Sequence, residues 1–575
     1  MPAENAEIAT LLRETADLLA IEGGNPFRIR AYRTAARIVE EHPESIAAIA
    51  ARDPKELTEL PGIGKDLAGK IAELARGRSF EVLRQARKRM PPGLTELMRL
   101  PGLGPKRAQQ LHHALKIRNL RDLERALKAG RLRAVPGFGE RTEQRLLTEL
   151  GAQKATSRRF LRARAAESAE RLVDHLRGLK GIRAIEVAGS YRRCVESVGD
   201  LDILVTAEGE SAVIERFVSF PGVARVLAKG PTRASVRLGS GLQVDLRLLA
   251  EESFGSGLYY FTGSKAHNIA VRRLALKRGL KVNEYGIFRG EKRVAGRTEE
   301  EVFRAVDLPW IPPELREDRG EIEAARANKL PALLELGDIR GDLQCHTTAS
   351  DGRNSLEQMA EAAEALGYAY LAITDHTPAL AMIQGLDRQG FRRQMKEIER
   401  LNGRLRELTV LAAAEVDILA DGSLDLDDDT MAALDLVVAS IHSRFALPEA
   451  KQTERVLRAL SHPSVDILGH PAGRIIGRRR PLPLAWDRVF ATARDHGVMI
   501  EVNGQPDRLD LDDRLVQVAI GQGVRLVVST DAHSTNELSF MRWGVDQARR
   551  GWAEKKDVAN TLPLRDFRKL LHGSR

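Results

Sequence analysis

Apolar and polar positions divide the chain into three stretches of different pattern. Residues 5–150 place apolar side chains at helical spacing, as at Ile8, Leu11 and Leu12, and predict an almost entirely helical region. From Gly341 onward, apolar runs such as YLAIT, VLAAAEVDI, LDLVVASIH, VDILGH, GVMIEVN and VRLVVSTDAH alternate with helical stretches. Runs spaced in this way predict βα units and a barrel. Strand-like runs lie between the two stretches, so we expect a multidomain protein of the α+β and α/β classes.

One pattern, Pro-Gly-apolar-Gly followed by a charged helix, occurs three times in the helical region. The copies are LPGIGKDLAGKIAEL from Leu60, LPGLGPKRAQQLHHAL from Leu100 and VPGFGERTEQRLLTEL from Val135. Each resembles a helix-hairpin-helix, whose turn places backbone N–H groups at a helix N-terminus, where they bind anions. A single copy would fit an ordinary helix connection, but three copies favour contacts to DNA phosphates, which carry no base sequence. The positions expected to make these contacts are Gly62, Gly64, Lys65, Gly102, Gly104, Lys106, Gly137 and Gly139.

The segment NPFRIRAYRTAARIV, ahead of the first repeat, predicts a basic helix with one aromatic side chain. The side chains concerned are Arg28, Arg30, Tyr32, Arg33 and Arg37. A pocket for a DNA end would have this composition, and so would a solvated helix face.

Two aspartates lie two residues apart in the apolar run of GSYRRCVESVGDLDILV, which starts at Gly189. On a strand, Asp200 and Asp202 point to the same face and repel each other unless a cation lies between them. Their hard oxygen atoms suit magnesium. Asp245, in LQVDLRLL, would complete a three-carboxylate site for two magnesium ions if its strand is a neighbour. An Asp-x-Asp pair alone also occurs at exposed strand ends, but this order of motifs favours a nucleotidyltransferase core.

The turn before the aspartates has the residues that a triphosphate requires. A glycine at position 189 lets the backbone approach a triphosphate closely, and Ser190 follows it. Arg192 and Arg193 offer positive charge to the same group.

Composition supports a large intracellular protein with a polyanionic partner. The 575 residues exceed the size of one core and suggest roughly three to five domains. Lys and Arg outnumber Asp and Glu by 90 to 80, which suits nucleic acid but also fits a merely basic surface. The two cysteines, Cys194 and Cys345, provide no disulfide framework. With no secretory signal and no apolar stretch of membrane-spanning length, we expect a soluble, cytoplasmic protein and no membrane partner.

The first half resembles a family X DNA polymerase of the polymerase beta type. The matching pieces are LPGIGKDLAGKI, LPGLGPKRAQQL, GSYRR, VGDLDILV, QVDLR, YFTGSKAHN and VNEYGI, which span most of residues 1–315. This resemblance implies a helical lyase-like domain, helix-hairpin-helix fingers, a nucleotidyltransferase palm and a small thumb-like domain. It implies that Asp200, Asp202 and Asp245 bind Mg²⁺ or Mn²⁺, and that the partners are dNTPs and gapped or nicked duplex DNA with a 5′-phosphate.

The same resemblance assigns the positions that meet the nucleotide. They are Gly189, Ser190, Arg193, Gly199, Tyr260, Phe261, Gly263, Asn268 and Arg272. Ser190 and Arg193 would contact the triphosphate. Tyr260 and Phe261 would lie against the sugar and exclude a ribose 2′-hydroxyl, although plain core packing explains these two aromatics as well. Asn268 and Arg272 would face the nascent base pair and the template.

Lys70 follows the first hairpin turn, where lyase members of the family have a Schiff-base lysine. A lysine attacks an abasic-site aldehyde when burial or nearby cations lower its pKa. The alternative is that Lys70 binds phosphate on the surface.

The second half has histidines and acids where its apolar runs end. These residues are His346, Asp375, His376, Glu415, His442, His470, Asn503, Asp531 and His533. Barrels carry their active sites at that end of the strands. Imidazole and carboxylate together suit zinc, manganese or iron, and the sequence does not choose among them. Five further histidines lack this context and are expected to be structural: His42, His175, His462, His496 and His572.

This half resembles the PHP (polymerase and histidinol phosphatase) domain, a distorted (β/α) barrel with a three-metal phosphoesterase centre. The matching runs are GDLQCHTTASDG, AITDHT, AAEVDI, ASIHS, GHP and STDAHS. The resemblance implies Mn²⁺ or Zn²⁺ and 3′→5′ exonuclease activity, and in some related chains the domain also cuts abasic sites. The implied ligands are His346, Asp351, His376, Glu415, His442, His470, Asp531 and His533.

One ligand position departs from the PHP pattern. The family opens with His-x-His, and Gln344 replaces the first histidine. An amide is a poorer ligand for a transition metal than imidazole. Cys345 would point to the opposite face of a strand and is not expected to substitute. The sequence leaves an active nuclease, a weakened one and a scaffold open, and retained activity is favoured because eight of nine positions remain.

Six segments are expected, with a proline-rich and charged linker between the halves. They are the lyase-like domain at 1–85, fingers at 86–155, palm at 156–252, thumb-like domain at 253–315, linker at 316–340 and PHP domain at 341–575.

Three functions remain possible, and the first is favoured. The chain is a monomeric gap-filling repair polymerase with an exonuclease domain, a DNA phosphoesterase whose palm only presents DNA, or a DNA-binding scaffold. A scaffold leaves three strand aspartates without a cation, which is costly. An RNA-tailing transferase shares the Gly-Ser and Asp-x-Asp motifs, but the hairpin repeats favour duplex DNA. The resemblance to bacterial members of family X implies a place at the nucleoid.

Overall fold

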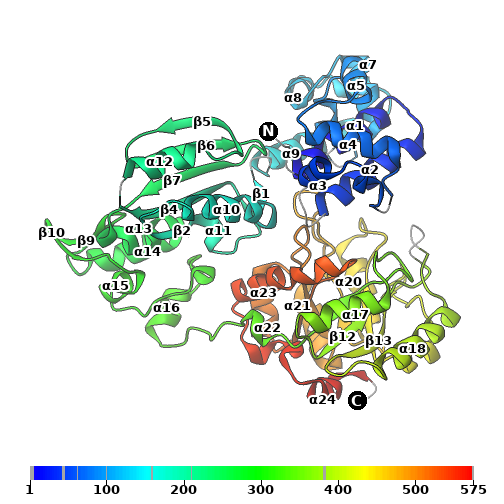
Figure 1. Cartoon of the computed structure of the whole chain (residues 1–575). Helices are drawn as coiled ribbons and strands as arrows, with labels where there is room; N and C mark the ends of the chain where they lie inside the picture. The colour runs from blue at the N-terminus through cyan, green and yellow to red at the C-terminus, as the bar shows by residue number, and fades with distance from the viewer. Residues whose placement is uncertain are drawn as a thin grey trace. The chain divides into compact units, whose positions relative to one another are not determined.

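The computed structural model describes residues 5–41, 46–60, 62–98, 100, 102–156, 159–208, 210–379 and 384–572. Figure 1 shows the chain coloured from its N-terminus to its C-terminus, and the chain divides into two compact units. The first contains Met1–Arg159 with Ser219–Arg225 and Arg237–Leu242, and the second contains the remaining residues. Among the described helices, none is long and apolar enough to cross a membrane.

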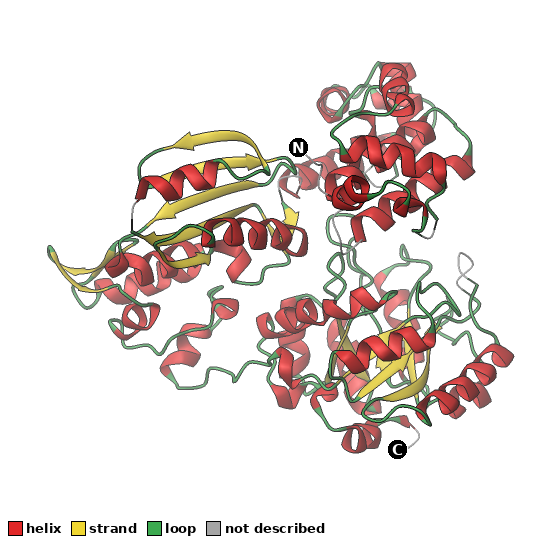
Figure 2. Cartoon of the chain, viewed as in Figure 1, coloured by secondary structure: helices red, strands yellow, loops and turns green. Residues whose placement is uncertain are grey.

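The N-terminal unit is helical, as the sequence predicts (Figure 2). One apolar core extends from Ile8 to Leu150 and includes residues of both expected segments, 1–85 and 86–155. The helices are α1 (Asn5–Ile21), α2 (Pro26–Glu41), α3 (Ile46–Arg52), α4 (Lys65–Ala75), α5 (Glu81–Arg89), α6 (Leu94–Leu97), α7 (Pro105–Leu115), α8 (Leu120–Lys128) and α9 (Glu140–Thr156).

A five-stranded sheet forms the palm. Its strand order is β2, β4, β7, β6, β5, and β4 and β7 are parallel neighbours. The strands are β2 (Ile182–Val187), β4 (Asp200–Ala207), β5 (Val223–Lys229), β6 (Arg233–Leu238) and β7 (Gln243–Leu248); a short pair, β1 (Phe160–Leu161) and β3 (Ser197–Val198), lies apart. The helices are α10 (Arg162–Arg177), α11 (Gly189–Arg192) and α12 (Glu210–Val218).

The thumb-like region combines helices with a small antiparallel sheet. Its elements are α13 (Phe254–Thr262), α14 (Lys265–Leu276), β8 (Lys281–Asn283), β9 (Gly286–Arg289), β10 (Lys292–Ala295) and α15 (Glu299–Arg304). The core of this region also contains Ile322 and Ala325 from α16 (Glu321–Arg326), within the expected linker 316–340.

Charged residues of that linker are buried because they are paired within the thumb-like region. The Arg316 guanidinium donates to Glu299 at 2.6 Å, and Glu321 lies 2.7 Å from His267. Arg316 and Glu321 are both fully buried. The first part of the expected linker therefore belongs to a core, although its composition is polar.

Seven parallel strands form the barrel, in chain order from β11 to β17. They are β11 (Gly341–Cys345), β12 (Tyr370–Ile373), β13 (Thr409–Asp417), β14 (Leu436–Ser440), β15 (Ile467–Leu468), β16 (Met499–Asn503) and β17 (Leu526–Ser529). A parallel bridge between Cys345 and Ala532 brings the first and last strands together. The sequence-based prediction of a βα barrel is confirmed.

Two apolar layers stabilise the barrel. The outer layer packs the strands against helices α17 (Leu356–Ala365), α18 (Arg388–Asn402), α19 (Asp428–Ala433), α20 (Glu449–Leu460), α21 (Trp486–His496), α22 (Asp513–Gly521) and α23 (Met541–Arg550). The inner layer includes Leu343, Ala372 and Val438, and α24 (Leu564–Phe567) closes it where the Phe567 ring stacks on Tyr370 at 5.3 Å. The polar residues at the C-terminal ends of the strands lie outside both apolar layers and are available to form a functional site.

Replacing Gly341 by alanine should destabilise the barrel by about 2–4 kcal/mol. A Cβ atom at this position would lie 2.3 Å from the Tyr370 ring and from its carbonyl oxygen. The measurement is urea-induced unfolding followed by tryptophan fluorescence. Gly337→Ala is the matched control, because a Cβ there meets nothing within 4 Å. Equal stability of the two variants would contradict this account of β11 packing.

Candidate active sites of the palm and the barrel

The three palm aspartates lie on adjacent parallel strands. Asp200 and Asp202 are on β4, and Asp202 is the direct register partner of Asp245 on β7. Leu201 and Ile203 are completely buried behind them. Neighbouring strands are about 4.8 Å apart, so the alternation expected from the sequence brings the carboxylates to one face.

Burial and mutual repulsion change the acidity of this group. Burial first, and then the charges of Asp200 and Asp245, raise the pKa of Asp202 to about 7. Asp245 accepts hydrogen bonds from the Ser235 hydroxyl and, at 3.1 Å, from the Gln243 amide. A divalent cation would relieve this repulsion, so the donor set fits the expected metal.

The palm carboxylates are more widely spaced than the ligands of the barrel. Among the described residues, groups of three or more ligand atoms that all lie within 4.8 Å of one another occur in the barrel alone. Two ions about 3.5–4 Å apart need a wider set of ligands than one ion. The three palm aspartates do not form so compact a group in this structure.

Gly189 could not be another residue without displacing an aspartate. Its φ is +68°, and a Cβ atom there would lie 2.9 Å from Asp202 Oδ2. At Gly199 a Cβ would meet nothing within 4 Å. The glycine turn expected to approach a triphosphate thus adjoins Asp202, whose pKa is raised.

Two glutamates form ion pairs with the two arginines of the turn. Glu299 lies in the thumb-like region, and Glu317 lies in the expected linker. Arg192 forms a two-point ion pair with Glu299, with its Nη1 at 2.8 Å. Arg193 donates through Nε to Glu317 at 3.0 Å and through Nη1 to the Thr262 carbonyl. Both guanidinium groups therefore already have anionic partners in this structure.

The expected sugar- and base-contacting residues lie at the junction of α13 and α14. Asn268 donates to the Tyr260 carbonyl at 2.8 Å, and Arg272 donates to the Asn268 carbonyl at 3.3 Å. The Arg247 guanidinium lies 4.4 Å from the centre of the Phe261 ring. A Cβ at Gly263 would come within 3.2 Å of Arg193 Nη1, so this segment adjoins the glycine turn.

The three hairpin turns have the same backbone geometry. Their first glycines, Gly62, Gly102 and Gly137, have φ of +85°, +86° and +82°. In each turn the residue after this glycine donates its N–H to a carbonyl three positions earlier, at 3.0 Å. The second glycines, Gly64, Gly104 and Gly139, have open space where a Cβ would be.

The open second glycine exposes a helix N-terminus. Gly64 and Gly104 precede α4 and α7, and neither helix has a side-chain cap. Lys65 and Lys106 are exposed beside them. The third turn instead leads into an acidic residue, Glu140. The first two turns are therefore better suited than the third to bind phosphate.

Lys70 lies on α4 beside an aromatic ring. Its Nζ is 5.3 Å from the centre of the Tyr32 ring and is paired with Asp66. The Lys70 side chain is 12% exposed. The structure thus joins two parts that the sequence suggested separately, the basic helix with Tyr32 and the hairpin lysine.

The barrel ligands form three overlapping groups at the strand ends. Each group has one atom per residue within 4.8 Å of the others. The groups are His346, Asp351, His376 and His533; His376, Glu415 and His442; and His346, Glu415 and Asp531. His470 adjoins the second group, with Nε2 at 2.9 Å from Glu415 Oε1. All eight expected ligands are therefore brought together.

The electrostatics of these groups fit bound cations. Both Glu415 oxygens and both His346 ring nitrogens are buried, and their polar neighbours include other members of these groups, such as His470 and Asp531. Glu415 is fully buried, which would raise its pKa, but the adjacent histidines hold that pKa well below its usual range. The His346 and His376 rings stack at 4.5 Å. Metal ions would satisfy these carboxylate and imidazole atoms together.

Gln344 lies on β11 in the barrel. It is completely buried, and neither amide atom has a hydrogen-bond partner. Its Oε1 would lie 3.3 Å from a Cβ at Gly469. Cys345 packs in the outer apolar layer and belongs to none of the three groups, as expected. The side chain at the departing PHP position is therefore buried in the barrel and belongs to none of the three groups.

Two polar residues that contact the ligands were missed in the sequence. Asp417 lies 3.2 Å from His442 Nδ1 and orients that ring. Arg508 lies 3.6 Å from Asp531 Oδ2 and is partly buried. The alternation of Glu415 and Asp417 on β13 was a signal for the first, and the sequence around Arg508 offered none.

The other chemically marked residues have structural surroundings. Asp375 accepts hydrogen bonds from Thr347, Ser350 and Gln394. Four histidines expected to be structural, His175, His462, His496 and His572, belong to none of the metal groups, and His42 lies outside the described residues.

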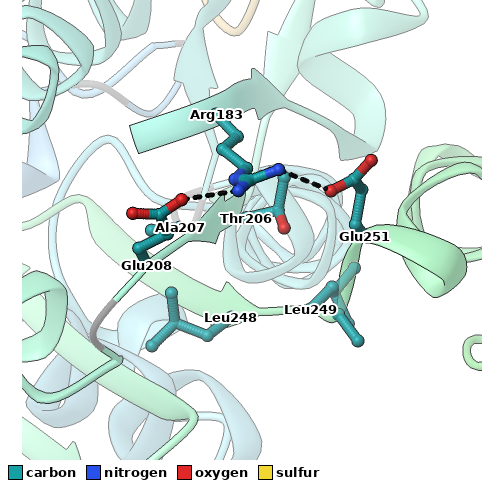
Figure 3. Close-up of a pocket in the computed structure, with 8 residues that line it drawn as sticks. Arg183, Thr206, Ala207, Glu208, Leu248, Leu249 and Glu251 are labelled. Atoms are coloured by element: carbon teal, nitrogen blue, oxygen red, sulfur yellow. Dashed lines mark hydrogen bonds and ion pairs between the residues drawn. The ribbon is translucent and has the colours of Figure 1, made fainter. Parts of the chain in front are cut away.

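A pocket at the opposite end of the palm strands is unrelated to the aspartates (Figure 3). It encloses about 260 Å³, and Arg183 bridges Glu208 and Glu251 across it. Glu208 follows the C-terminal end of β4, whereas Asp200 starts that strand. Glu208, which lines this pocket, is therefore a suitable position for a control variant.

Comparison with known proteins identifies the family. The chain is 38% identical over 570 residues to the DNA polymerase/3′-5′ exonuclease PolX of Bacillus subtilis, and the match covers 98% of this chain and 99% of the relative. The chain belongs to the PolX family. Family models match the DNA polymerase beta thumb at 257–317, a helix-hairpin-helix domain at 3–80, a SAM-like helix-hairpin-helix tandem at 94–152 and the PHP domain at 342–505.

This chain also resembles two smaller proteins over about a third of its length. A probable phosphatase of Acetivibrio thermocellus is 30% identical over 206 residues, which is 34% of this chain and 80% of that relative. A probable phosphatase of Clostridium acetobutylicum is 27% identical over 203 residues, 33% of this chain and 78% of the relative. The resemblances to family X and to the PHP domain inferred from the sequence are confirmed.

Magnesium binding to the palm should release about one proton at pH 6 and almost none at pH 8.5. Because burial and like charges raise the pKa of Asp202 to about 7, this carboxyl is mostly protonated at pH 6 until a cation binds. Calorimetric titration in buffers of different ionisation enthalpy counts the protons. Asp202→Asn, compared with wild type, separates the palm from the barrel. The same proton count in both proteins would contradict the assignment.

Proposed function

We propose that this chain is a DNA polymerase that fills short gaps during DNA repair and removes 3′-terminal nucleotides with its barrel. The observation that carries the polymerase part is the register of Asp202 opposite Asp245 beside the glycine turn at Gly189. Neither a scaffold nor a phosphoesterase that merely presents DNA requires this arrangement of acids.

In the palm, the three aspartates would hold two Mg²⁺ or Mn²⁺ ions. These ions, when bound, would activate the primer 3′-hydroxyl and neutralise the charge of the departing pyrophosphate. Asp202 has to lose its proton to act, and Ser235 and Gln243 orient Asp245. The nucleotide would lie against the glycine turn, with Ser190 and Arg193 on the triphosphate and the Tyr260–Phe261 segment against the sugar.

In the helical unit, the hairpin turns would hold the DNA backbone on either side of a gap. Support comes from the uncapped N-termini of α4 and α7 beside Lys65 and Lys106. Lys70 and Tyr32 would line a pocket for the 5′-phosphate end, where Lys70 is also placed to attack an abasic aldehyde. We propose that the enzyme works as a monomer at the nucleoid in the bacterial cytoplasm.

In the barrel, the three groups would hold Mn²⁺ or Zn²⁺, which would supply a metal-bound nucleophilic water and stabilise the phosphate charge. Glu415 is shared by two groups, and Asp351 joins His376 to His533. Asp417 holds His442 for metal binding. The result would be hydrolysis of the terminal phosphodiester bond.

Separate variants should remove one activity and keep the other. Asp202→Asn should reduce extension of a 5′-phosphorylated gap by about a thousandfold and leave 3′-end removal intact, because it weakens the palm ion site alone. His533→Ala should do the reverse. Labelled primers resolved on gels report both reactions.

Matched controls lie outside both sites. Glu208→Gln removes a carboxylate at the far end of β4 (Figure 3), and His496→Ala removes a histidine outside the metal groups. Extension that survives Asp202→Asn would refute the polymerase proposal, and 3′-end removal that survives His533→Ala would refute the nuclease proposal.

Restoring a histidine at position 344 should add about one tightly bound metal ion per chain and increase 3′-end removal in manganese. His346, Glu415 and Asp531 provide three ligands, and an imidazole would complete four. Metal analysis of Gln344→His after gel filtration measures the ion directly, with Gln344→Leu as the size-matched control. Unchanged metal content in the histidine variant would contradict the proposed deficit.

A further inference from the structure

The proposed function has Arg193 bind the triphosphate of the nucleotide. In this structure the Arg193 guanidinium is instead paired with a carboxylate of the protein, that of Glu317. Its Nε donates to Glu317 Oε1 at 3.0 Å. The two side chains are 14% and 16% exposed, so water screens this pair less than a surface pair. Nucleotide binding through Arg193 therefore has to replace an existing ion pair.

The same oxygen of Glu317 is shared with a cation from the barrel. Arg550, the last residue of α23, donates through Nη1 to Glu317 Oε1 at 3.0 Å and to the Arg193 carbonyl oxygen at 2.6 Å. Its Nη2 donates to Asp513 at 2.6 Å, and Arg319 also pairs with Asp513 at 3.0 Å. The Arg550 side chain is 4% exposed.

The second ion pair, with Arg550, means that Glu317 keeps a positive partner when a nucleotide binds Arg193. Removing one partner of a buried ion pair is strongly unfavourable when the other charge is left alone. If Glu317 had only Arg193 as a partner, a triphosphate that took Arg193 would leave the carboxylate uncompensated. Because Arg550 stays beside Glu317, the carboxylate keeps a counter-charge after the exchange.

We propose that Glu317 forms an ion pair with the Arg193 guanidinium when no triphosphate is bound. When a nucleotide replaces Glu317 on Arg193, Glu317 stays paired with Arg550. Glu317 and Arg550 are thus positioning residues for nucleotide binding, one on the connector and one on the barrel. This inference rests on the proposed function, in which Arg193 binds the triphosphate. Nothing in the polymerase chemistry itself requires a carboxylate at this place.

The steric setting limits where Arg193 can go. A second donor, Nη1, is bound to the Thr262 carbonyl, and a Cβ at Gly263 would lie 3.2 Å from that nitrogen. The guanidinium is therefore held from two sides, by the backbone of the thumb-like region and by Glu317. Removing the carboxylate frees the Nε edge and leaves the backbone contact, so Arg193 stays near the glycine turn.

The test is Glu317→Gln, measured by single-turnover extension of a one-nucleotide gap over a range of dNTP concentrations. The variant should bind dNTP about three- to tenfold more tightly, since the competing charge is gone, with a maximal rate within about twofold of wild type. Unchanged or weaker dNTP binding would overturn the proposal, as would a change confined to the maximal rate.

Asp318→Asn is the matched control for a general field effect. It removes the same charge one residue away, at an exposed position whose φ of +59° asparagine adopts readily. Asp318→Asn should leave dNTP binding within about twofold of wild type. Equal tightening in both variants would mean that local charge, and not competition for Arg193, sets the affinity, and the proposal would fail.

Arg193→Ala separates this inference from the function it rests on. If Arg193 binds the triphosphate, this variant should weaken dNTP binding by about tenfold or more. If Arg193→Ala weakens dNTP binding and Glu317→Gln does not tighten it, the proposed role of Glu317 is refuted and the triphosphate role of Arg193 stands. No effect in Arg193→Ala refutes the triphosphate role, and the proposal for Glu317 with it.

Discussion

Repulsion between carboxylates fixed on adjacent parallel strands is the constraint on which the palm depends. The register that sets Asp202 opposite Asp245 is imposed by backbone hydrogen bonds, so the acids cannot separate without breaking the sheet. Their repulsion, together with burial, raises the pKa of Asp202 to about 7. The sheet thus holds the carboxylates together at an electrostatic cost, which a bound divalent cation would remove.

The barrel handles buried charge differently. Its fully buried Glu415 has a lowered pKa because imidazole rings surround it, so the carboxylate is ionised before any metal binds. Positive backbone φ angles at His470 and Asp531, +25° and +54°, show that the strand ends turn sharply to aim these ligands. Such backbone conformations are costly for residues other than glycine and are typical of functional sites. The palm relies on register, whereas the barrel relies on turns after its strands.

Local motifs could be predicted from the sequence because each depends on a short segment. The hairpin glycines are an example, since a turn with φ near +85° at Gly62 is a property of a few adjacent residues. The burial of the first part of the linker could not be predicted. The sequence alone suggests that Arg316 is exposed to solvent, because its partner Glu299 lies 17 residues away. The pair of Glu317 with Arg550 joins positions 233 residues apart, and no local pattern carries that information.

The two sites act on the same bond in opposite directions, so the balance between them matters to net synthesis. A palm that extends a primer gains nothing if the barrel removes each nucleotide at the same rate. Gln344 stands where the PHP pattern has a histidine, and an amide supplies much less to a transition metal than imidazole. A metal ion that needed this position as a ligand would bind more weakly here, and removal of nucleotides would then slow relative to synthesis. The chemistry of one buried side chain would in that way shift the balance between the two reactions.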